Sequence, residues 1–555
     1  MYFLFSILIA FYIAVVLIPL LRQAALNRQL TDMPDERKVH ERPTPRVGGI
    51  GIVAGAVAPV LFMVHPSREI SAYLAGVLIL FVTCVWDDLS GLNYKQKFLG
   101  QILAIVVTMA IGRIAITNLG IWGTTEIMLP VWIALPLTLF FVLGITNAIN
   151  LADGLDGLAG GISILVFLSI GVLAYLDDNI AIVVCCLGIA GALLAFLRYN
   201  TFPATIFMGD TGSQFLGFSA ATLCVYLTQG QSTAIAKTLP LIILGFPILD
   251  TLTVMSERMA RGISPFKPDR RHFHHRLLRL GFTHKDAVLG IYIVQALMVF
   301  LSIRLRYFAE VWVVAIYLVL AASILFFFYS AHHAGWQFQA GIGIDRLINI
   351  LAEKKLDAAL KTLSLKTMHI LLPLWLVWLS LSSSLTFFRG NIGILVLSLI
   401  TLAVSAVNRR VFAVLFRLTS YAVVLYLLLT TQENTSFLHL FSPQLAHHLC
   451  WGVLAACAVI FLVVTRFETF DITPLDVLVI MIVISIPFLP VSHAKTLHLG
   501  TVAGGMVVFL WTSEILISQQ KRWLAPLPLS CVAVVLILTV RYVLLALHQG
   551  QTQLL

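Results

Sequence analysis

The chain is built from long apolar runs, and the length of these runs decides what it can fold into. Of its 555 residues, 59% are hydrophobic and only 11% are charged. Most runs have roughly 17–25 residues, the length that an α-helix needs to cross a lipid bilayer. Because hydrocarbon offers the backbone no hydrogen-bond partners, spans of this kind must be helices or closed barrels, and runs of this length favour helices. The sequence therefore predicts an all-α polytopic membrane protein with no nucleic-acid partner and excludes a soluble globule.

The apolar runs fall into two groups. The first group has about 11 runs, at residues 2–21, 48–64, 71–86, 97–117, 131–146, 158–176, 180–197, 212–228, 238–255, 286–303 and 310–330. The second has about 7 runs, at residues 368–387, 391–407, 411–430, 448–465, 476–492, 498–517 and 528–547. We therefore predict a membrane domain over residues 1–330 and a C-terminal transmembrane extension over residues 368–555, to which the sequence assigns no role.

The segment that joins the two groups covers residues 331–367. Its leucine and isoleucine residues recur near helical spacing, with lysines between them. This pattern is typical of an amphipathic helix that lies on a membrane surface. A plain helical linker between two membrane bundles is compatible with the same residues.

Basic loops set the expected orientation. Residues 22–46 and the loop after the ninth run are rich in lysine and arginine, and loops of that kind stay in the cytoplasm. Both loops follow odd-numbered runs, so the two assignments agree and the N-terminus is expected outside. Four polar clusters follow runs three, five, seven and nine, so all four are expected at the cytoplasmic face.

The first two clusters contain paired carboxylates. Asp87 and Asp88 end the third run, where adjacent acids suit either Mg²⁺ coordination or a base that shares a proton, and a solvated loop with an ion pair is the alternative. Asp153 and Asp156 lie in NAINLADGLDGLAGG, between two membrane runs. Carboxylates at such a seam favour a functional site, and the glycines let the backbone approach a ligand. An ordinary polar loop is the alternative here.

The third cluster is TIFMGDTGSQFLG, which places Asp210 just before an apolar helix. Free N–H groups at a helix start can hold phosphate, and an Asp among them is useful if it binds a metal that bridges to that phosphate. Asp210 could instead be a simple N-cap of the helix, which is a common use of aspartate.

The fourth cluster is SPFKPDRRHFHHRLLRL, where histidines stand among basic residues. The spacing matches neither a zinc-protease helix nor a zinc finger. Arginine and histidine side chains that hold a diphosphate fit the positive charge. A cytoplasmic basic loop with incidental histidines is the alternative.

Together the four clusters indicate a site for an anionic, metal-bound substrate at one face of the membrane. An ion-coupled transporter or flippase is the competing class of protein. A transporter places its charged groups near the middle of the bilayer on broken helices, whereas these clusters lie at helix ends. The pattern therefore favours an enzyme.

Five stretches of the first 330 residues resemble the polyprenyl-phosphate N-acetylhexosamine-1-phosphate transferases of glycosyltransferase family 4. They are DERKVHERPTPRVGG, DDLSGLNYKQKFLGQ, NAINLADGLDGLAGG, IFMGDTGS and SPFKPDRRHFHH, and they occur in the order of the family. The His-x-His-His form of the last stretch is similar to the WecA-type branch, because the MraY enzymes carry three adjacent histidines instead.

The resemblance implies a reaction in a bacterial plasma membrane. The donor would be UDP-N-acetylglucosamine or a close UDP-N-acetylhexosamine, rather than the alternative donor UDP-MurNAc-pentapeptide. The acceptor would be undecaprenyl phosphate, the soluble product UMP, and the lipid product the first intermediate of a cell-envelope glycan. The family implies Mg²⁺ as cofactor, with Mn²⁺ as the alternative, and leaves a homodimer open.

The resemblance also implies which residues act. The metal ligand would be Asp210, with Asp87 as a further candidate. The implied catalytic residues are Asp87, Asp88, Asp153, Asp156, His272, His274 and His275. The implied substrate-binding residues are Arg42, Lys95, Lys97, Asn150, Gly154, Phe207 and Arg271.

Within these sets, each substrate has its own implied residues. Asp87 would contact or deprotonate the lipid phosphate, and the two lysines would neutralise phosphate charge. Phe207 would stack on the uracil. The histidines and Arg271 would hold the diphosphate and the sugar.

Overall fold

The computed structural model describes most of the first 338 residues and parts of the rest. The described ranges are 2–28, 43–230, 233–264, 271–338, 356–382, 443–465, 474–485 and 499–519, with isolated positions between 423 and 428 and between 534 and 541. Arg42, residues 339–355 of the predicted interfacial segment and most of three predicted C-terminal spans lie outside the described residues. The chain divides into two compact units, one of Met1–Ala340 with Thr473–Leu478 and the other of Gly341–Ile472 with Val479–Leu555.

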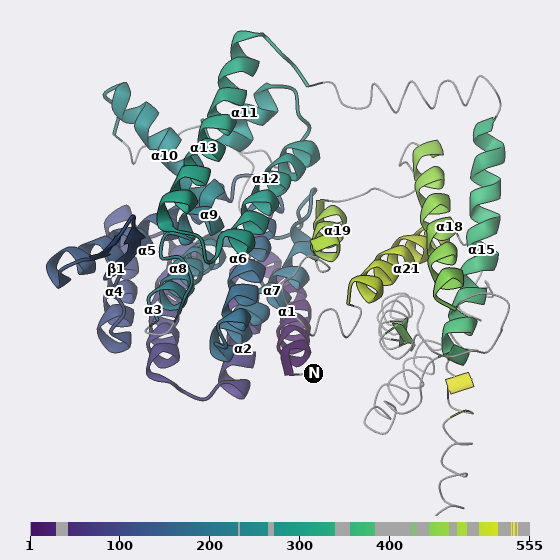
Figure 1. The fold of residues 1–555 in the computed structure, drawn as a ribbon, viewed down its shortest axis with the longest axis horizontal. Coiled ribbons are helices and arrows are strands. Elements are labelled where there is room, and N and C mark those ends of the chain that lie inside the picture. Colours follow the sequence, from purple (N-terminus) through teal and green to yellow (C-terminus); the bar gives the residue numbers. More distant parts are fainter. Residues whose placement is uncertain are drawn as a thin grey trace, which may run out of the picture. The chain divides into compact units, whose positions relative to one another are not determined.

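The first unit is a bundle of helices (Figure 1). In chain order they are α1 (Tyr2–Asn27), α2 (Gly48–Met63), α3 (Arg68–Ser90), α4 (Tyr94–Gly112), α5 (Val131–Ala152), α6 (Leu158–Leu176), α7 (Ile180–Asn200), α8 (Gly209–Thr228), α9 (Pro240–Ile243), α10 (Gly245–Ala260), α11 (Phe273–Arg279), α12 (His284–Leu305) and α13 (Glu310–His333). Eight helices in the described part of the chain are long and apolar enough to cross a membrane. The predicted helical, multi-pass membrane protein is thereby confirmed, whereas the count of 11 plus 7 spans stays a prediction.

Two elements depart from the predicted series of spans. The ninth apolar run is divided between α9 and α10, because the helix stops at Leu244 and starts again at Gly245. The connection between the fourth and fifth apolar runs contains an antiparallel hairpin of β1 (Asn118–Trp122) and β2 (Thr125–Met128). Hydrophobic run length reports membrane spans, so it signals neither a break inside a run nor a strand outside one.

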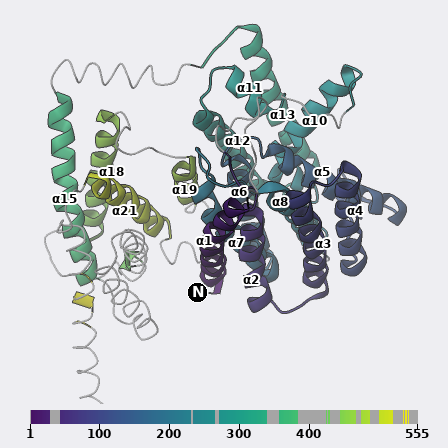
Figure 2. The same ribbon diagram turned by 180° about the vertical axis from the view of Figure 1, so that it is seen from behind.

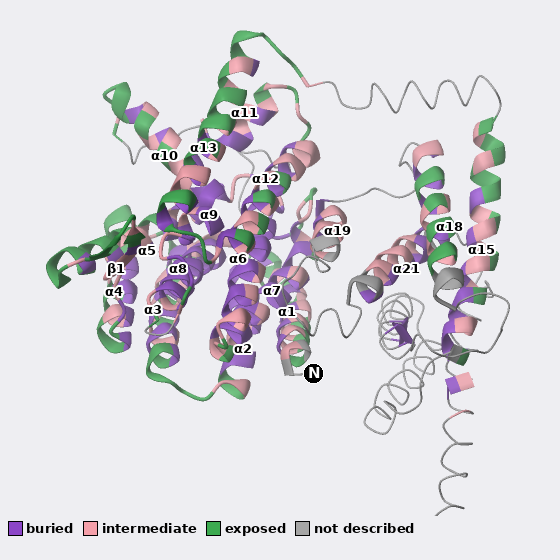
Figure 3. Ribbon diagram, in the orientation of Figure 1, coloured by how far each residue is buried: buried purple, intermediate pink, exposed green. Residues whose placement is uncertain are grey.

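The most deeply buried helices of this unit are α6, α7 and α8. Figure 3 shows α6 and α8 mostly buried, whereas α4 and α13 keep broad exposed faces. α7 packs against α1, α2 and α6, and α8 packs against α3 and α5 (Figure 2). The exposed side chains of α13 are largely apolar, as expected for a helix that faces lipid.

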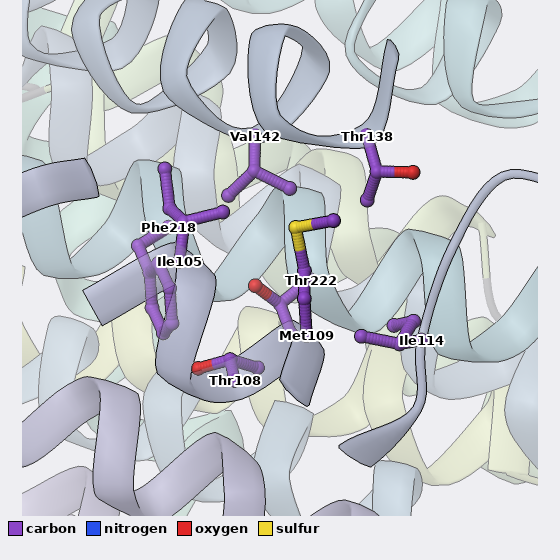
Figure 4. Close-up of a pocket in the computed structure, with 8 residues that line it drawn as sticks. All are labelled: Ile105, Thr108, Met109, Ile114, Thr138, Val142, Phe218 and Thr222. Carbon is purple, nitrogen blue, oxygen red and sulfur yellow. The ribbon is translucent and has the colours of Figure 1, made fainter. Parts of the chain in front are cut away.

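A small apolar pocket lies between α4, α5 and α8 (Figure 4). Its lining residues are Ile105, Thr108, Met109, Ile114, Thr138, Val142, Phe218 and Thr222. No charged side chain is among them, so this pocket lacks the groups that would hold a phosphate.

The second unit contains α15 (Leu356–Ser382), α18 (Pro443–Val464), α21 (Leu499–Gln519) and part of α19 (Pro474–Ser485). α15, α18 and α21 pack against one another around an apolar core that includes Trp375, Phe461 and Phe509. α15 continues without a break through residue 367, where the sequence placed the end of the linker.

Candidate active site

Two carboxylates from distant parts of the chain meet at one lysine. Lys97 Nζ lies 2.6 Å from Asp87 Oδ2 and 3.0 Å from Asp210 Oδ2. Asp87 belongs to the last turn of α3, and a capping box made by Asn93 and Gln96 starts α4 a few residues later. This tight connection puts Lys97 in the first turn of α4, beside the end of α3. The structure thus brings Asp87, Lys97 and Asp210 into one cluster.

Asp88 has a different position from its neighbour. Its Oδ1 accepts the N–H of Asp210 at 2.9 Å, and its Oδ2 accepts the N–H of Thr211 at 2.9 Å and the hydroxyl of Thr211 at 2.6 Å. Asp88 therefore caps α8 from another helix, as an N-cap side chain does locally. Gly209 has a φ of 65° and a side chain there would collide with the Asp88 carboxylate, so only glycine fits.

Because Asp88 caps α8, the alternative that Asp210 is a simple N-cap of this helix can be tested. The N-cap position of α8 is Met208, which makes no side-chain cap bond. The carboxylate of Asp210 instead contacts Lys97 and accepts a hydrogen bond from Gln214 Nε2 at 3.1 Å. Asp210 is therefore not a simple N-cap, and its side chain is turned toward Lys97. We refer to Asp87, Lys97 and Asp210 as the acid cluster.

A chain of buried amides supports Asp210 from inside the bundle. Gln101 Nε2 donates to Gln214 Oε1 at 2.8 Å, and Asn147 Nδ2 donates to Gln101 Oε1 at 3.0 Å. Gln101 and Gln214 are each 2% exposed. All three amides lie in the quoted sequence stretches, but no role was inferred for them, although polar side chains in or beside membrane runs are a signal of function.

The acid cluster fits a magnesium ion by the chemistry of its donors. Mg²⁺ prefers oxygen ligands and is commonly held by one or two carboxylates, with water and phosphate oxygens in the remaining positions. Asp87 and Asp210 direct one carboxylate oxygen each at the same cationic group. Within the described ranges, no group of three or more His, Cys, Asp or Glu side chains is placed to hold a metal ion. A site completed by substrate oxygens is therefore the kind that fits.

The loop between α5 and α6 is fixed by residues on two other helices. Asp156 Oδ2 accepts the N–H of Ala204 at 2.9 Å. Gly157 N donates to Asn200 Oδ1 at 2.9 Å, and the Tyr292 hydroxyl donates to Gly157 O at 2.7 Å. Asn200 and Tyr292 are both buried and were not identified from the sequence. The loop is therefore hydrogen-bonded to α7, to the segment that follows α7 and to α12.

Asp153 in this loop has a shifted pKa. Burial raises the pKa of the Asp153 carboxyl to about 7, and the nearby carboxylates of Asp156 and Asp210 act in the same direction. An unfolded chain would lose this proton at about pH 4. The folded protein therefore holds more protons than the unfolded chain between about pH 4 and pH 7, and its stability falls as the pH rises through that window.

We expect this pH dependence to be visible in the metal-free protein. The thermal unfolding midpoint of the wild type in EDTA should decrease from pH 5 to pH 7 more steeply than that of Asp153→Asn, which has no proton to lose. Differential scanning fluorimetry of both proteins measures the difference. Parallel curves for the two proteins would contradict the raised pKa of Asp153.

Residues implied for the nucleotide lie around the start of α8. Phe207 N donates to Pro45 O at 2.8 Å, and Gly48 N donates to Phe207 O at 2.9 Å. These bonds fasten the PTPRVGG stretch to the IFMGD stretch. Asn150 Oδ1 accepts a hydrogen bond from the Ser213 hydroxyl at 2.8 Å, so the end of α5 is also tied to α8.

The histidine segment is anchored by an acid on α10. His272 Nδ1 lies 2.8 Å from Asp250 Oδ2, and Phe273 N donates to Asp250 Oδ1 at 2.7 Å. The rings of His272 and His274 are parallel within 4°, with centroids 5.8 Å apart. His275 follows, its centroid 4.2 Å from that of His274. No role was inferred for Asp250 from the sequence, because it lies inside the ninth apolar run and outside the quoted motifs. A lone acid in such a run is nevertheless a signal of function.

His274 lies against the loop between α5 and α6. A Cβ atom on Gly154 would lie 2.3 Å from His274 Nε2, so the imidazole occupies the space that any other residue would need. Burial lowers the pKa of His274 to about 3, and the neighbouring His275 adds to this effect. His274 is therefore neutral at physiological pH and offers hydrogen bonds rather than positive charge.

We expect Gly154→Ala to lower the rate of UMP release, the reaction that the family resemblance implies, at least about tenfold. The added methyl group must displace His274 or the loop. Gly144→Ala on α5 is the matched control, since a Cβ there meets no atom within 4 Å. Turnover of the two purified variants under the same conditions measures the effect. Equal activity of Gly154→Ala and Gly144→Ala would show that the contact between Gly154 and His274 does not affect the reaction.

The remaining predicted residues are less closely joined to the site. Lys95 is exposed and its ammonium lies 5.9 Å from the ring centroid of Tyr94. The carbonyl of Arg271 accepts a hydrogen bond from Arg276 Nε at 2.7 Å, which fixes the backbone before α11. Among the other implied residues that the structure describes, Asp88, Phe207 and Asn150 lie around the start of α8, and the rest belong to the acid cluster, the loop and the histidine segment. Figures 1 and 2 place α10 and α11 at one end of the bundle.

Comparison with known proteins assigns the chain to a family. Residues 70–228 match the sequence model of glycosyl transferase family 4. The chain is 36% identical over 311 residues to a probable undecaprenyl-phosphate N-acetylglucosaminyl 1-phosphate transferase of Bacillus subtilis, an alignment that covers 55% of this chain and 86% of the relative. It is 32% identical over 316 residues to the undecaprenyl-phosphate alpha-N-acetylglucosaminyl 1-phosphate transferase of Escherichia coli K12, covering 56% of this chain and 85% of the relative. The resemblance of the five stretches is thereby confirmed, and the chain belongs to glycosyl transferase family 4.

Proposed function

We propose that this protein transfers N-acetylglucosamine 1-phosphate from UDP-N-acetylglucosamine to undecaprenyl phosphate and releases UMP. One observation carries the proposal: Asp87, Lys97 and Asp210 form one ionic cluster, and the loop between α5 and α6 connects this cluster to the histidines. Asp153 of the loop interacts with Asp210, and Gly154 of the loop packs against His274. Positive and negative groups in one cluster suit a reaction between two phosphate-bearing substrates. The names of the bacterial relatives support N-acetylglucosamine as the sugar.

In the proposed reaction, an oxygen of the lipid phosphate attacks the β-phosphorus of the donor. The bond between that phosphorus and the bridging oxygen breaks, and UMP leaves with the bridging oxygen. Lys97 offsets the negative charge of the incoming phosphate, and Asp87 accepts any proton that the phosphate carries. When bound at Asp210, Mg²⁺ would offset the charge that builds up on the donor diphosphate.

The chain's other groups hold the donor in the proposed site. Phe207 and the loop with Gly154 take the uridine, and the imidazoles of the histidine segment take the diphosphate. The transfer is direct in this scheme, with no covalent enzyme intermediate. Isolation of a phosphorylated Asp87 would contradict this part of the proposal.

The proposal also places the site at the cytoplasmic face of a bacterial plasma membrane, with the N-terminus outside. Two properties support this orientation. The basic loops are expected inside, and a UDP-sugar reaches the membrane from the cytosol while the lipid stays in the bilayer.

The decisive experiment uses the purified full chain with undecaprenyl phosphate, Mg²⁺ and a panel of UDP-sugars. We expect UMP release with UDP-N-acetylglucosamine, dependence on the lipid and loss of activity in EDTA, with Mn²⁺ tested as a replacement. Omission of undecaprenyl phosphate is the control for simple hydrolysis. No UMP with any UDP-sugar, or UMP without a lipid product, would overturn the proposed function.

A further inference from the structure

We propose that Asp250 is a positioning residue that acts through His272: it holds the ring proton on Nδ1 and so leaves Nε2 to face the donor diphosphate. This inference rests on the proposed function, in which the histidine segment holds the donor. Neither the sequence motifs nor the comparisons assign a role to Asp250. The positioning role of Asp250 is argued from the contact between α10 and the start of α11.

The contact uses both oxygens of one buried carboxylate. Asp250 is 3% exposed and His272 is 5% exposed. One oxygen lies 2.8 Å from His272 Nδ1, and the other accepts the N–H of Phe273 at 2.7 Å. A carboxylate deep in the protein must be paired or hydrogen-bonded, and these two contacts meet that need.

This geometry determines which nitrogen of His272 carries the proton. A carboxylate can only accept, so Nδ1 of the ring must be the donor. Nε2 is then an acceptor in the neutral ring and a second donor in the charged ring. The same arrangement orients imidazole ligands in metal sites, where loss of the supporting carboxylate typically costs a factor of about 10–100 in affinity or activity.

The effect of Asp250 extends to the neighbouring histidine. The parallel rings of His272 and His274 keep their planes aligned. His274 in turn fills the space beside Gly154 in the loop between α5 and α6. The carboxylate on α10 therefore orients one imidazole directly, and the parallel histidine ring beside it contacts another part of the site.

A second acid on α10 supplies a matched control. Glu257 lies two turns after Asp250, and its Oε1 is 2.6 Å from Arg276 Nη2 on α11. The side chain of Glu257 is 32% exposed and contacts no histidine of the segment in the bonds described above. Removing its charge weakens the attachment of α11 without changing the tautomer of His272.

The experiment compares five purified full-length variants in the UMP-release assay: Asp250→Asn, Asp250→Ala, His272→Ala, the double variant Asp250→Asn/His272→Ala, and Glu257→Gln. Asparagine keeps the size of Asp250 and can still accept the N–H of Phe273. Its amide donates to Nδ1, which moves the ring proton to Nε2. We expect Asp250→Asn to lose about 10–100-fold in turnover, with an unfolding midpoint close to that of the wild type.

Three readouts separate a positioning role from a structural one. The KM for undecaprenyl phosphate should change little in Asp250→Asn, because the defect is confined to the donor side. In the His272→Ala background, Asp250→Asn should cause no further loss, because its partner is already gone. Glu257→Gln should keep activity within about twofold of the wild type, as for a partly exposed ion pair.

Each contrary result overturns the inference. Full activity of Asp250→Asn with loss only in Asp250→Ala would mean that the carboxylate merely starts α11. Additive losses in the double variant would mean that Asp250 does not act through His272. Equal losses in Glu257→Gln and Asp250→Asn would mean that any loosening of α11 has the same effect.

Failure of the proposed function is distinguishable from failure of this inference. If the wild type releases no UMP with any UDP-sugar, the proposed function fails and the tautomer is read directly. The ¹⁵N NMR shifts of labelled histidine should then place the His272 proton on Nδ1 in the wild type and on Nε2 in Asp250→Asn. The same tautomer in both proteins overturns the inference.

Discussion

Asp210→Asn is expected to lower UMP release about a thousandfold while the protein keeps its fold. Asparagine has the same size and can still accept the hydrogen bond from Gln214, so the buried amide chain stays intact. It lacks the charge that pairs with Lys97 and that a metal ion would need. The loss should therefore appear in turnover and in Mg²⁺ dependence, measured by UMP release over a range of Mg²⁺ concentrations.

The control for this substitution is Asp286→Asn. Asp286 also lies in the first turn of a helix, α12, where it pairs with the Thr283 hydroxyl at 2.6 Å. It is not part of the acid cluster, so we expect wild-type turnover. Near-wild-type activity of Asp210→Asn would remove Asp210 from the metal site and leave it a supporting role only.

The second large effect is expected for Asp87→Asn, which should lower kcat by a factor of about 10²–10⁴. The introduced asparagine can still accept the N–H of Leu92, which Asp87 Oδ1 holds at 2.7 Å, so the end of α3 should persist. It cannot accept a proton, and it leaves Lys97 with one carboxylate instead of two. Single-turnover rates at saturating undecaprenyl phosphate separate this chemical defect from weaker binding.

Glu69→Gln is the control on the same helix. Glu69 is an exposed acid in the first turn of α3, at the opposite end from Asp87. We expect it to leave the single-turnover rate unchanged. A normal rate in Asp87→Asn would show that the lipid phosphate needs no acceptor at this position.

The helices of the first unit could be predicted from the sequence because a membrane span has a characteristic length and composition. The proximity of Asp87 and Asp210 was predicted for a related reason, since counting spans assigns each helix end to one side. Both inferences need only information along the chain. The break between α9 and α10 could not be predicted in this way, because the two helices share one apolar run.

The roles of individual polar residues depended on tertiary structure. Asp87 and Asp88 are adjacent and chemically identical, and only the position of α8 shows that one pairs with Lys97 while the other caps a helix. Asp250 has its partner on a separate helix, and Asn200 bonds a loop 43 residues away. No local pattern specifies such pairs, so a lone acid or amide in an apolar run indicates importance without indicating the partner.

The cap that Asp88 supplies to α8 has a consequence for how loss-of-function variants of this protein should be sorted. Three hydrogen bonds join the end of α3 to the start of α8, and loss of an ordinary helix cap costs about 1–2 kcal/mol. A deficit of that size changes how much protein survives cellular quality control. Cells that carry Asp88→Ala should therefore contain less of the enzyme in their membranes, whereas cells that carry Asp87→Asn should contain normal amounts of a slow one. Immunoblots of membrane fractions beside activity per molecule would tell the two kinds of defect apart.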